Sequence, residues 1–258
     1  MLAYQRKGQG PTLVLVHGYL AGSAIWAAQI EYFSRDFDVI CPDLAGFGAS
    51  ADLTAPESIQ GHARLVLDLL DSLQIDQFDL LGHSMGGMIV QAMAVIAPAR
   101  LRSLVLYGTG PQGVLPGRFE TIAQSRARII EQGLSDTARR IAATWFLQGE
   151  QAEGFALCHR LGQQAQLQAA LASLTAWEAW DGRPALCDIT ARCLVIWGSR
   201  DRSYNWSQPE ALWRAITGAD LAVVPNCAHN VHLEKPHLFN ILLADFLRTG
   251  CVQDQNKV

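Results

Sequence analysis

Short, continuously apolar runs of residues recur along this chain, and longer amphipathic stretches separate them. Strands that are apolar at every position are buried on both faces, which is typical of a parallel sheet covered by helices on each side. Alternation of such strands with helices predicts an α/β fold with a mostly parallel sheet. The predicted strands are residues 12–16, 38–43, 78–82, 103–108, 192–198 and 220–225.

The stretches between these strands have helical patterns. The expected helices lie near residues 24–34, 56–73, 86–97, 208–216 and 236–248. The second of them carries a start signal, because Thr54 and Glu57 form a T-x-x-E capping pattern and Pro56 falls in the first turn. We therefore predict that this helix begins at about residue 56.

The alternation of strands and helices breaks between about residues 111 and 190, where no stretch resembles a strand. Ala, Gln and Leu are frequent there, as in LGQQAQLQAALASLTAWEAW, and this composition favours helices. We therefore expect a helical insertion over residues 111–190. The core domain would then consist of residues 1–110 and 191–258.

The composition is that of a globular protein, with 50% hydrophobic and 17% charged residues and a formal net charge of −4. No basic patch stands out, so we expect no nucleic-acid partner. The uncharged stretches 8–30 and 80–99 contain proline, histidine and several glycines, and we interpret each as strand, turn and helix rather than as a membrane span. The N-terminus lacks the apolar core of a signal peptide, and the six cysteines form no CxxC pair. We predict a cytoplasmic protein with reduced thiols, no metal site and no membrane partner.

One short segment at the end of a predicted strand has the pattern of a catalytic serine turn. Residues 82–86, GHSMG, fit the pattern G-x-S-x-G directly after a strand and directly before a helix. In that context Ser84 lies on a sharp turn with positive φ, and glycine is needed on each side because side chains would collide there. The turn exposes the hydroxyl at the carboxyl end of the sheet, beside the N-terminus of a helix. A glycine-rich connection with an incidental serine is the alternative interpretation.

A serine hydroxyl needs a base, and the chain has seven histidines. His229 follows the last predicted strand in a loop, so we expect it at the same edge of the sheet as Ser84. The base in turn needs a carboxylate that fixes its tautomer. Asp201 follows the preceding predicted strand, so we predict that Ser84, Asp201 and His229 form a catalytic triad.

Other residues could take these roles. His232 lies close to His229 in the sequence, and we interpret it as a surface residue. His17 and Asp43 also follow predicted strands. We interpret both as structural residues that hold their loops.

Hydrolysis of a carbonyl group also requires donors for the oxyanion. The first expected donor is the backbone N–H of Met85, the residue after the nucleophile. The second is expected from the loop after the strand 12–16. In that loop, HGYLAG, the expected donor is the N–H of Tyr19. Backbone donors leave only an indirect trace in a sequence.

Several segments together resemble the α/β-hydrolase superfamily: LVLVHGY, DLAGFGAS, GHSMGG, GSRD and NCAHNVHLEKP. The resemblance covers the whole chain, and residues 111–190 match least. It implies an α/β-hydrolase fold with a mostly parallel eight-stranded sheet, helices on both faces, and a helical cap over the active site. By position it carries Ser84 over as nucleophile, His229 as base and Asp201 as the orienting acid. No cofactor and no metal ion are expected.

Within the superfamily the chain is loosely similar to small, cofactor-free bacterial carboxylesterases, including the pimeloyl-acyl-carrier-protein methyl esterases. We therefore predict a serine esterase that cleaves a small carboxylic ester or thioester, free or linked to a carrier protein, through an acyl-enzyme. Relatives of this size also open lactones or cleave C–C bonds in dienone acids. The C–C hydrolases usually carry a loop HG-x-G-P-G, whereas this chain has HGYLAGS. A serine rather than an aspartate at position 84 argues against haloalkane dehalogenases and epoxide hydrolases.

Two other classes of protein use the same scaffold. Ligand-binding receptors often lose the serine or the histidine, and here all triad positions are filled. Perhydrolases, lyases and cofactor-free oxygenases share the fold, and spacing in the sequence does not separate them from an esterase. We expect a monomer or a homodimer that acts on a small molecule.

Ligand pockets are lined mainly by apolar side chains, and such side chains occur in the expected helical insertion and just after Ser84. For the aromatic residues there, packing within the cap is the alternative to contact with substrate. The candidate pocket residues are Met88, Trp145, Phe146, Trp177 and Trp180. Arg200 and Arg202 flank Asp201, and we interpret them as solvated rather than as ligands of a substrate carboxylate.

Overall fold

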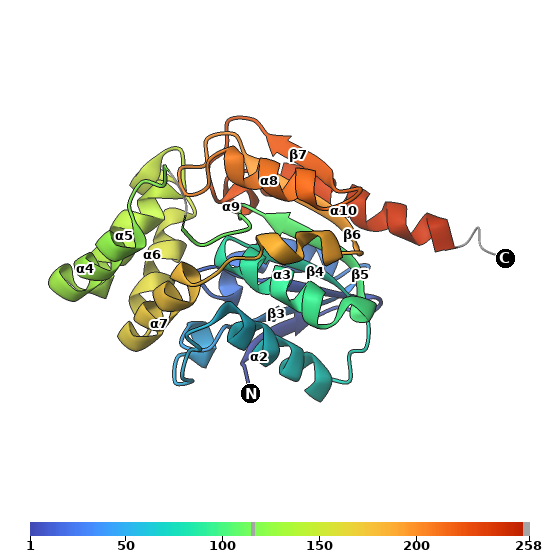
Figure 1. The fold of residues 1–258 in the computed structure, drawn as a ribbon, viewed down its shortest axis with the longest axis horizontal. Helices are drawn as coiled ribbons and strands as arrows, with labels where there is room; N and C mark the ends of the chain where they lie inside the picture. The colour runs from blue at the N-terminus through green and yellow to red at the C-terminus, as the bar shows by residue number, and fades with distance from the viewer. Residues whose placement is uncertain (115–116, 255–258) are drawn as a thin grey trace.

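Seven strands form one sheet in the computed structural model, which describes residues 1–114 and 117–254 (Figure 1). The spatial order of the strands is β1-β3-β2-β4-β5-β6-β7. Every neighbouring pair is parallel except β1 with β3. The strands are β1 (Tyr4–Lys7), β2 (Thr12–Val16), β3 (Asp38–Pro42), β4 (Phe78–His83), β5 (Leu101–Tyr107), β6 (Arg192–Gly198) and β7 (Asp220–Val224).

The predicted fold class is confirmed, and all predicted strands are present. The sheet differs from the prediction in its size, because the described residues form seven strands instead of the expected eight. Strand β1 has the sequence YQRK and was not predicted. It is exposed at every position and pairs only with β3, and an edge strand without a buried face carries no apolar signal in the sequence.

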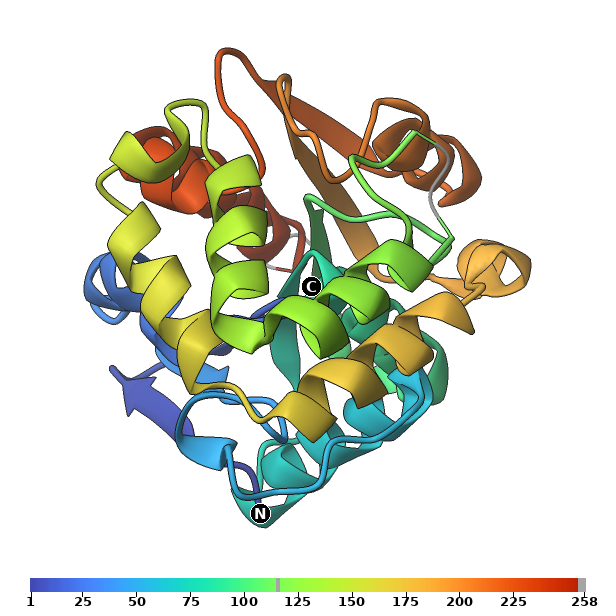
Figure 2. The ribbon, with the colours of Figure 1, turned by 90° about the vertical axis from the view of Figure 1, so that its left-hand side faces the viewer.

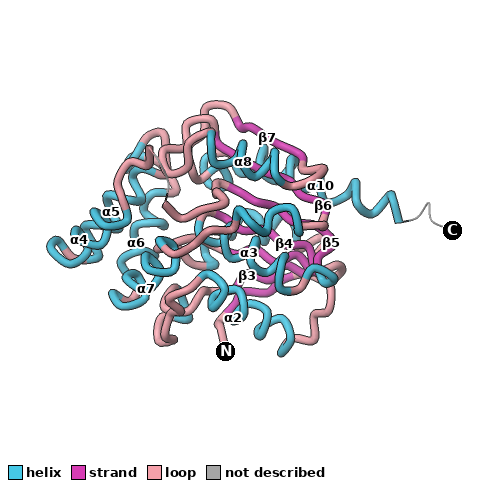
Figure 3. The backbone as a smooth tube through the Cα atoms, viewed as in Figure 1, coloured by secondary structure: helices cyan, strands magenta, loops and turns pink. Residues whose placement is uncertain are grey.

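Alternate residues of the central strands divide the hydrophobic core into two layers. Leu13 and Leu15 of β2 belong to a cluster with α1 and α10 on one face of the sheet. Val14 and Val16 belong to a cluster with α2, α3 and α8 on the other face. Helices therefore cover both faces, as the continuous apolar runs predicted, and Figure 3 shows the strands between them. The core helices are α1 (Ala27–Phe33), α2 (Ile59–Ser72), α3 (Met85–Ile96), α8 (Ser207–Ala215) and α10 (Pro236–Asp254).

Helix α2 begins later than predicted, and its cap is a different residue. Ser58 is the N-cap, and its hydroxyl oxygen accepts a hydrogen bond from the Gly61 N–H at 3.1 Å. The predicted capping pattern of Thr54 and Glu57 is therefore wrong. Ala55 is buried in the core, so the chain enters the helix only beyond it, where Ser58 offers the same kind of acceptor.

Between β5 and β6 the chain leaves the sheet and forms further helices at one end of it. Figure 2 views this end, with these helices in green and yellow in front of the sheet. Between residues 111 and 190, the part that the structure describes contains no strand. Within the described ranges, no helix combines the length and apolarity needed to cross a membrane. We call the following the inserted helices: α4 (Ile122–Gln132), α5 (Leu134–Thr144), α6 (Phe155–Gln164) and α7 (Leu167–Glu178).

Candidate active site

Ser84 lies on the sharp turn between β4 and α3. Its backbone has φ +57° and ψ −122°, a conformation that residues other than glycine rarely adopt. The end of β5 holds this turn in place. The Ser84 N–H donates to the Tyr107 carbonyl oxygen at 3.0 Å, and the Thr109 hydroxyl donates to the Ser84 carbonyl oxygen at 2.7 Å. A strained residue held by several contacts is typical of a functional turn.

The glycines on each side of Ser84 are required by close contacts of the backbone. A Cβ atom at Gly82 would collide with the carbonyl oxygen of Gly86. A Cβ atom at Gly86 would lie 2.5 Å from the carbonyl oxygens of Val16 and His17. The end of β2 and the start of α3 therefore approach each other so closely that only glycine fits between them.

His229 and Asp201 form a buried pair beside this turn. His229 Nδ1 lies 2.8 Å from Asp201 Oδ2, and the two side chains are 1% and 0% exposed. The other carboxylate oxygen, Oδ1, accepts hydrogen bonds from the N–H groups of Ser203 at 2.7 Å and Tyr204 at 3.1 Å. The pair fixes a proton on Nδ1 and leaves Nε2 as an acceptor. The imidazole can therefore take up a proton at Nε2.

Aromatic side chains hold the His229 imidazole in one orientation. The Tyr204 ring stacks on it with centroids 5.6 Å apart and 14° between the planes, and the His83 ring packs 4.5 Å away. The Tyr107 hydroxyl donates to the His229 carbonyl oxygen at 2.9 Å. Burial lowers the pKa of His83 well below its usual value, so His83 is a neutral neighbour. Both the ring and the backbone of His229 are thus fixed.

His232 is not the surface residue that the sequence suggested. It is fully buried, with its ring 4.6 Å from that of Trp26 and its Nδ1 atom 3.0 Å from the Tyr107 hydroxyl. Burial, with a smaller contribution from His229, lowers the pKa of His232 to about 3. The sequence pattern here is that of a loop, whereas the short helix α9 (Val231–Glu234) begins there and turns the side chain into the core.

The rival candidates for base and acid hold loops, in agreement with the structural roles expected for them. His17 Nε2 accepts a hydrogen bond from the Leu44 N–H at 3.0 Å. Asp43 accepts hydrogen bonds from the N–H groups of Ser23 at 2.6 Å and Ala49 at 3.1 Å. These contacts join the loops that follow β2 and β3.

The residues expected to supply the oxyanion donors lie next to Ser84, one along the chain and one in a neighbouring loop. Met85 is the first residue of α3 and follows Ser84 directly. A Cβ atom at Gly18 would lie 2.8 Å from the Ser84 Cβ atom, so the loop that continues into Tyr19 passes directly beside the serine. Leu20 in the same loop has φ +53°, a second strained position at this edge of the sheet. Backbone N–H groups placed on two sides of a hydroxyl are suited to hold a developing negative charge.

A small cavity opens onto Ser84 and His229, and one of the candidate pocket residues lines it. Trp145 is that residue, and its ring lies 6.2 Å from the His229 ring. Cys158 and Asn230 also line the cavity. Burial raises the pKa of the Cys158 thiol to about 12, so the thiol is a neutral part of the wall.

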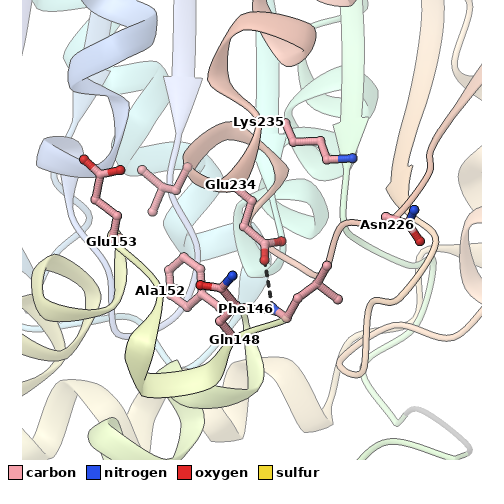
Figure 4. Close-up of a pocket in the computed structure, with 10 residues that line it drawn as sticks. Phe146, Gln148, Ala152, Glu153, Asn226, Glu234 and Lys235 are labelled. Carbon is pink, nitrogen blue, oxygen red and sulfur yellow. Dashed lines mark hydrogen bonds between the residues drawn. The ribbon is translucent and has the colours of Figure 1, made fainter.

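The other candidate pocket residues lie elsewhere. Met88 is fully buried in the core against the sheet, and Trp180 packs against Gly182. Phe146 lines a separate pocket together with Glu234 (Figure 4). Trp177 packs beside Tyr19, with ring centroids 6.1 Å apart, and so lies next to the cavity without lining it.

Sequence reasoning missed Tyr204, although a signal for it existed. Tyr204 follows Asp201 closely in GSRDRSY, and a turn that gives its N–H groups to the carboxylate brings the chain back toward the base. Cys158 belongs to no motif, and Asn230 lies in NCAHNVHLEKP without a predicted role. Their position depends on how α6 packs against the loop of His229, which leaves no local signal.

Comparisons with known proteins agree with this fold. A family model described as the alpha/beta hydrolase fold matches residues 11–236. The chain is 31% identical to 3-oxoadipate enol-lactonase 2 of Acinetobacter baylyi, over 93% of this chain and 90% of that protein. It is 30% identical to the 2-hydroxy-6-oxo-6-phenylhexa-2,4-dienoate hydrolase of Burkholderia cepacia, over 94% and 90%. The crystal structure of an enol-lactonase from Burkholderia xenovorans is similar with a TM-score of 0.88, at 25% identity and 96% coverage of both chains.

Proposed function

Because the chain belongs to the α/β-hydrolase fold family, we propose that it is a serine hydrolase with Ser84 as nucleophile, His229 as base and Asp201 as orienting acid. The observation that carries this proposal is the buried 2.8 Å contact between His229 and Asp201 beside the strained Ser84 turn. We further propose that the cleaved bond is a carboxylic ester or thioester, open-chain or cyclic. Hydrolysis is the reaction class of its relatives.

In the first half of the proposed reaction, the enzyme becomes acylated. Ser84 Oγ attacks the carbonyl carbon while His229 Nε2 takes the hydroxyl proton, and Asp201 stabilises the imidazolium that forms. The N–H groups of Met85 and Tyr19 donate to the negatively charged oxygen of the tetrahedral intermediate. His229 then gives its proton to the leaving oxygen or sulfur atom, which departs and leaves an acyl group on Ser84.

The second half releases the acid. A water molecule attacks the acyl carbon, and His229 Nε2 takes one of its protons. When the tetrahedral intermediate collapses, His229 returns that proton to Ser84 Oγ. The carboxylic acid leaves and the free enzyme is restored without a cofactor.

We also propose that residues 111–190 form a cap on a core made of residues 1–110 and 191–258. Contacts at the end of α5 support this assignment. Trp145 lines the cavity, and its carbonyl oxygen accepts a hydrogen bond from the Asn230 N–H at 3.1 Å. The inserted helices are thereby joined to the loop that carries His229.

Hydrolysis of a C–C bond is a second candidate function. It is favoured by the 30% identity to a dienoate hydrolase, whereas the identity of 31% to an enol-lactonase favours opening of a cyclic ester. The loop sequence HGYLAGS departs from the HG-x-G-P-G of C–C hydrolases. This difference makes ester or lactone cleavage the preferred proposal.

The first test compares the wild-type protein with Ser84→Ala on 4-nitrophenyl esters from acetate to palmitate. We expect hydrolysis by the wild type to peak at short chains, because the cavity at Ser84 is small. The substitution should lower kcat by roughly 10⁴- to 10⁶-fold, and a fluorophosphonate probe should label only the wild type. A folded Ser84→Ala protein that keeps most of its rate would overturn the assignment of the nucleophile. A serine-dependent rate on dienone acids but on no ester or lactone would favour C–C hydrolysis.

A further inference from the structure

Four buried polar groups without partners lie together next to His229. Tyr19 Oη, Tyr204 Oη, Trp177 Nε1 and Arg118 Nε make no hydrogen bond within the described part of the chain. Tyr204, Trp177 and Tyr19 are only 0%, 2% and 3% exposed. Buried donors are almost always paired in folded proteins, so a group of unpaired ones requires an explanation.

The four side chains form one continuous cluster. The Arg118 guanidinium lies 4.5 Å above the Trp177 ring. The Trp177 ring lies 6.1 Å from that of Tyr19 and 6.3 Å from that of Tyr204, on which it stacks at 17°. Tyr204 in turn stacks on His229. We call Arg118, Tyr19, Tyr204 and Trp177 the donor cluster.

The donor cluster also reaches the proposed nucleophile. Tyr19 lines the cavity that opens onto Ser84, and Tyr204 stacks on the proposed base His229. Trp177 lies beside both tyrosines and carries the Arg118 guanidinium over its ring. The donor cluster therefore extends from Arg118 to the edge of the cavity at Ser84.

Arg118 forms no ion pair with a carboxylate among the described residues. Its Nη1 donates to the backbone carbonyl oxygen of Glu120 at 3.1 Å. The Glu120 carboxylate is instead paired with Arg140 at 2.7 Å and Arg128 at 3.4 Å. Burial lowers the pKa of Arg118, but a guanidinium remains protonated in proteins. The cluster thus combines a positive charge that belongs to no ion pair with neutral donors.

The other arginines near Asp201 do not compete for this role. Arg202 Nη2 donates to the carbonyl oxygens of Ala143 and Phe146 at 3.4 and 3.2 Å, and Arg200 is exposed. Arg118 also lines a further pocket together with Thr121, Glu120 and Glu178, and both of these carboxylates are paired with other arginines. A ligand could reach the guanidinium from that side.

We propose that Arg118, Tyr19 and Tyr204 bind a carboxylate group of the substrate and so place its ester carbonyl at Ser84. A carboxylate is acceptor-only and pairs with a guanidinium through charge-assisted hydrogen bonds. The substrate class is therefore an ester or lactone that carries a free carboxylate. This inference rests on the proposed function, because it takes Ser84 as the reacting group.

The kinetic test uses matched esters that differ in one carboxylate. The 4-nitrophenyl half-esters of glutarate and adipate are compared with 4-nitrophenyl pentanoate and hexanoate. We expect the wild type to prefer the charged ester, and Arg118→Met to lower the ratio of kcat/KM for charged over neutral ester by roughly 10- to 100-fold. Arg118→Lys should restore part of the ratio. The control Arg200→Met removes the same charge from an exposed site and should leave the ratio unchanged.

A binding test separates failure of this inference from failure of the proposed function. Monomethyl adipate and dimethyl adipate are titrated by calorimetry into the folded Ser84→Ala protein, which does not need to turn them over. We expect the monomethyl ester to bind at least about tenfold more tightly, and we expect Arg118→Met to abolish the difference. Equal or absent binding of the two esters overturns the inference, as does a wild-type enzyme without preference for the charged esters. Loss of the proposed function appears separately, as esterase activity that survives Ser84→Ala.

Discussion

The strand ends around Ser84 and the donor cluster next to them differ in how their polar groups are satisfied. On the side of the strand ends, each candidate catalytic residue is held by hydrogen bonds: Thr109 holds the Ser84 carbonyl, and Tyr107 holds that of His229. Two N–H groups and the imidazole occupy both carboxylate oxygens of Asp201. On the side of the donor cluster, four donors make no hydrogen bond within the described part of the chain.

This difference indicates a division of labour. Groups that perform chemistry must be held in place before the substrate arrives, because a misplaced base or nucleophile lowers the rate directly. Groups that recognise a ligand can remain unpaired, since the ligand supplies the missing partner. The predictions below test each side of this comparison, beginning with the largest effect.

Catalysis should be lost when one acceptor oxygen of Asp201 is replaced by a hydrogen-bond donor. In Asp201→Asn, the amide oxygen can still accept from the N–H groups of Ser203 and Tyr204, while the NH₂ group faces His229 Nδ1. The imidazole proton then moves to Nε2, and the base is lost. We expect kcat to fall roughly 10³- to 10⁴-fold on 4-nitrophenyl esters, with little change in melting temperature.

Asp43→Asn is the matched control for this substitution. Asp43 is also a buried carboxylate that accepts two backbone N–H groups, but it holds a loop. We expect it to lower the melting temperature and to change kcat less than tenfold. Equal losses of rate in the two variants would remove the distinction between the orienting and the structural carboxylate.

His62 tests what an unpartnered polar group does where no ligand is expected. Both of its ring nitrogens are buried without a partner in the described residues, and it does not line the cavity at Ser84. Burial lowers its pKa to about 4. Because the unfolded chain binds this proton near pH 6.5, stability should fall as the pH decreases from about 6.5 to about 4, by up to about 1.4 kcal/mol per pH unit.

The measurement is the free energy of unfolding against pH for the wild type and His62→Leu. We expect a flatter profile in the variant over this range and no loss of stability at pH 7, because no hydrogen bond is removed. A variant with the wild-type slope would show that other groups cause the acid sensitivity, of which His232 is the first to consider.

The candidate catalytic residues could be proposed from the sequence because their signals are local. The Ser84 turn needs glycines at fixed spacing, and Asp201 and His229 follow apolar runs that mark the strands. Parallel strands then bring these ends to one edge of the sheet. The assignment of the three residues as a triad stays a prediction, which the geometry supports.

The donor-cluster side left much weaker signals. Arg118 belongs to no motif, and its position depends on how its segment packs against Trp177 of α7. Of the candidate pocket residues, Trp145 lines the cavity while Phe146, its neighbour in the chain, lines another pocket. Composition identifies aromatic residues in a helical segment, but only the packing of the helices decides which way each one faces.

Glu234 joins the chain that follows α5 to the loop of His229, and its substitution gives the smallest expected effect. Its Oε1 atom accepts from the Leu147 N–H at 2.7 Å, as Figure 4 shows, and its Oε2 atom accepts from the Ala228 N–H at 2.7 Å. Leu147 lies beyond α5, and Ala228 directly precedes His229. In Glu234→Gln one of these N–H groups must face the NH₂ group, which should destabilise the protein by about 1–2 kcal/mol.

The effect of Glu234→Gln on kcat and KM shows whether the contact to Ala228 or the contact to Leu147 is lost. If the Ala228 contact is lost, the loop of His229 loosens and kcat should fall by about threefold to tenfold; if the Leu147 contact is lost, the inserted helices loosen and KM should rise instead. Glu153→Gln, at an exposed position in the same pocket, is the control and should change neither. A Glu234→Gln enzyme with wild-type kcat, KM and stability would mean that the inserted helices and the loop of His229 are held together by other contacts, such as that between Asn230 and Trp145.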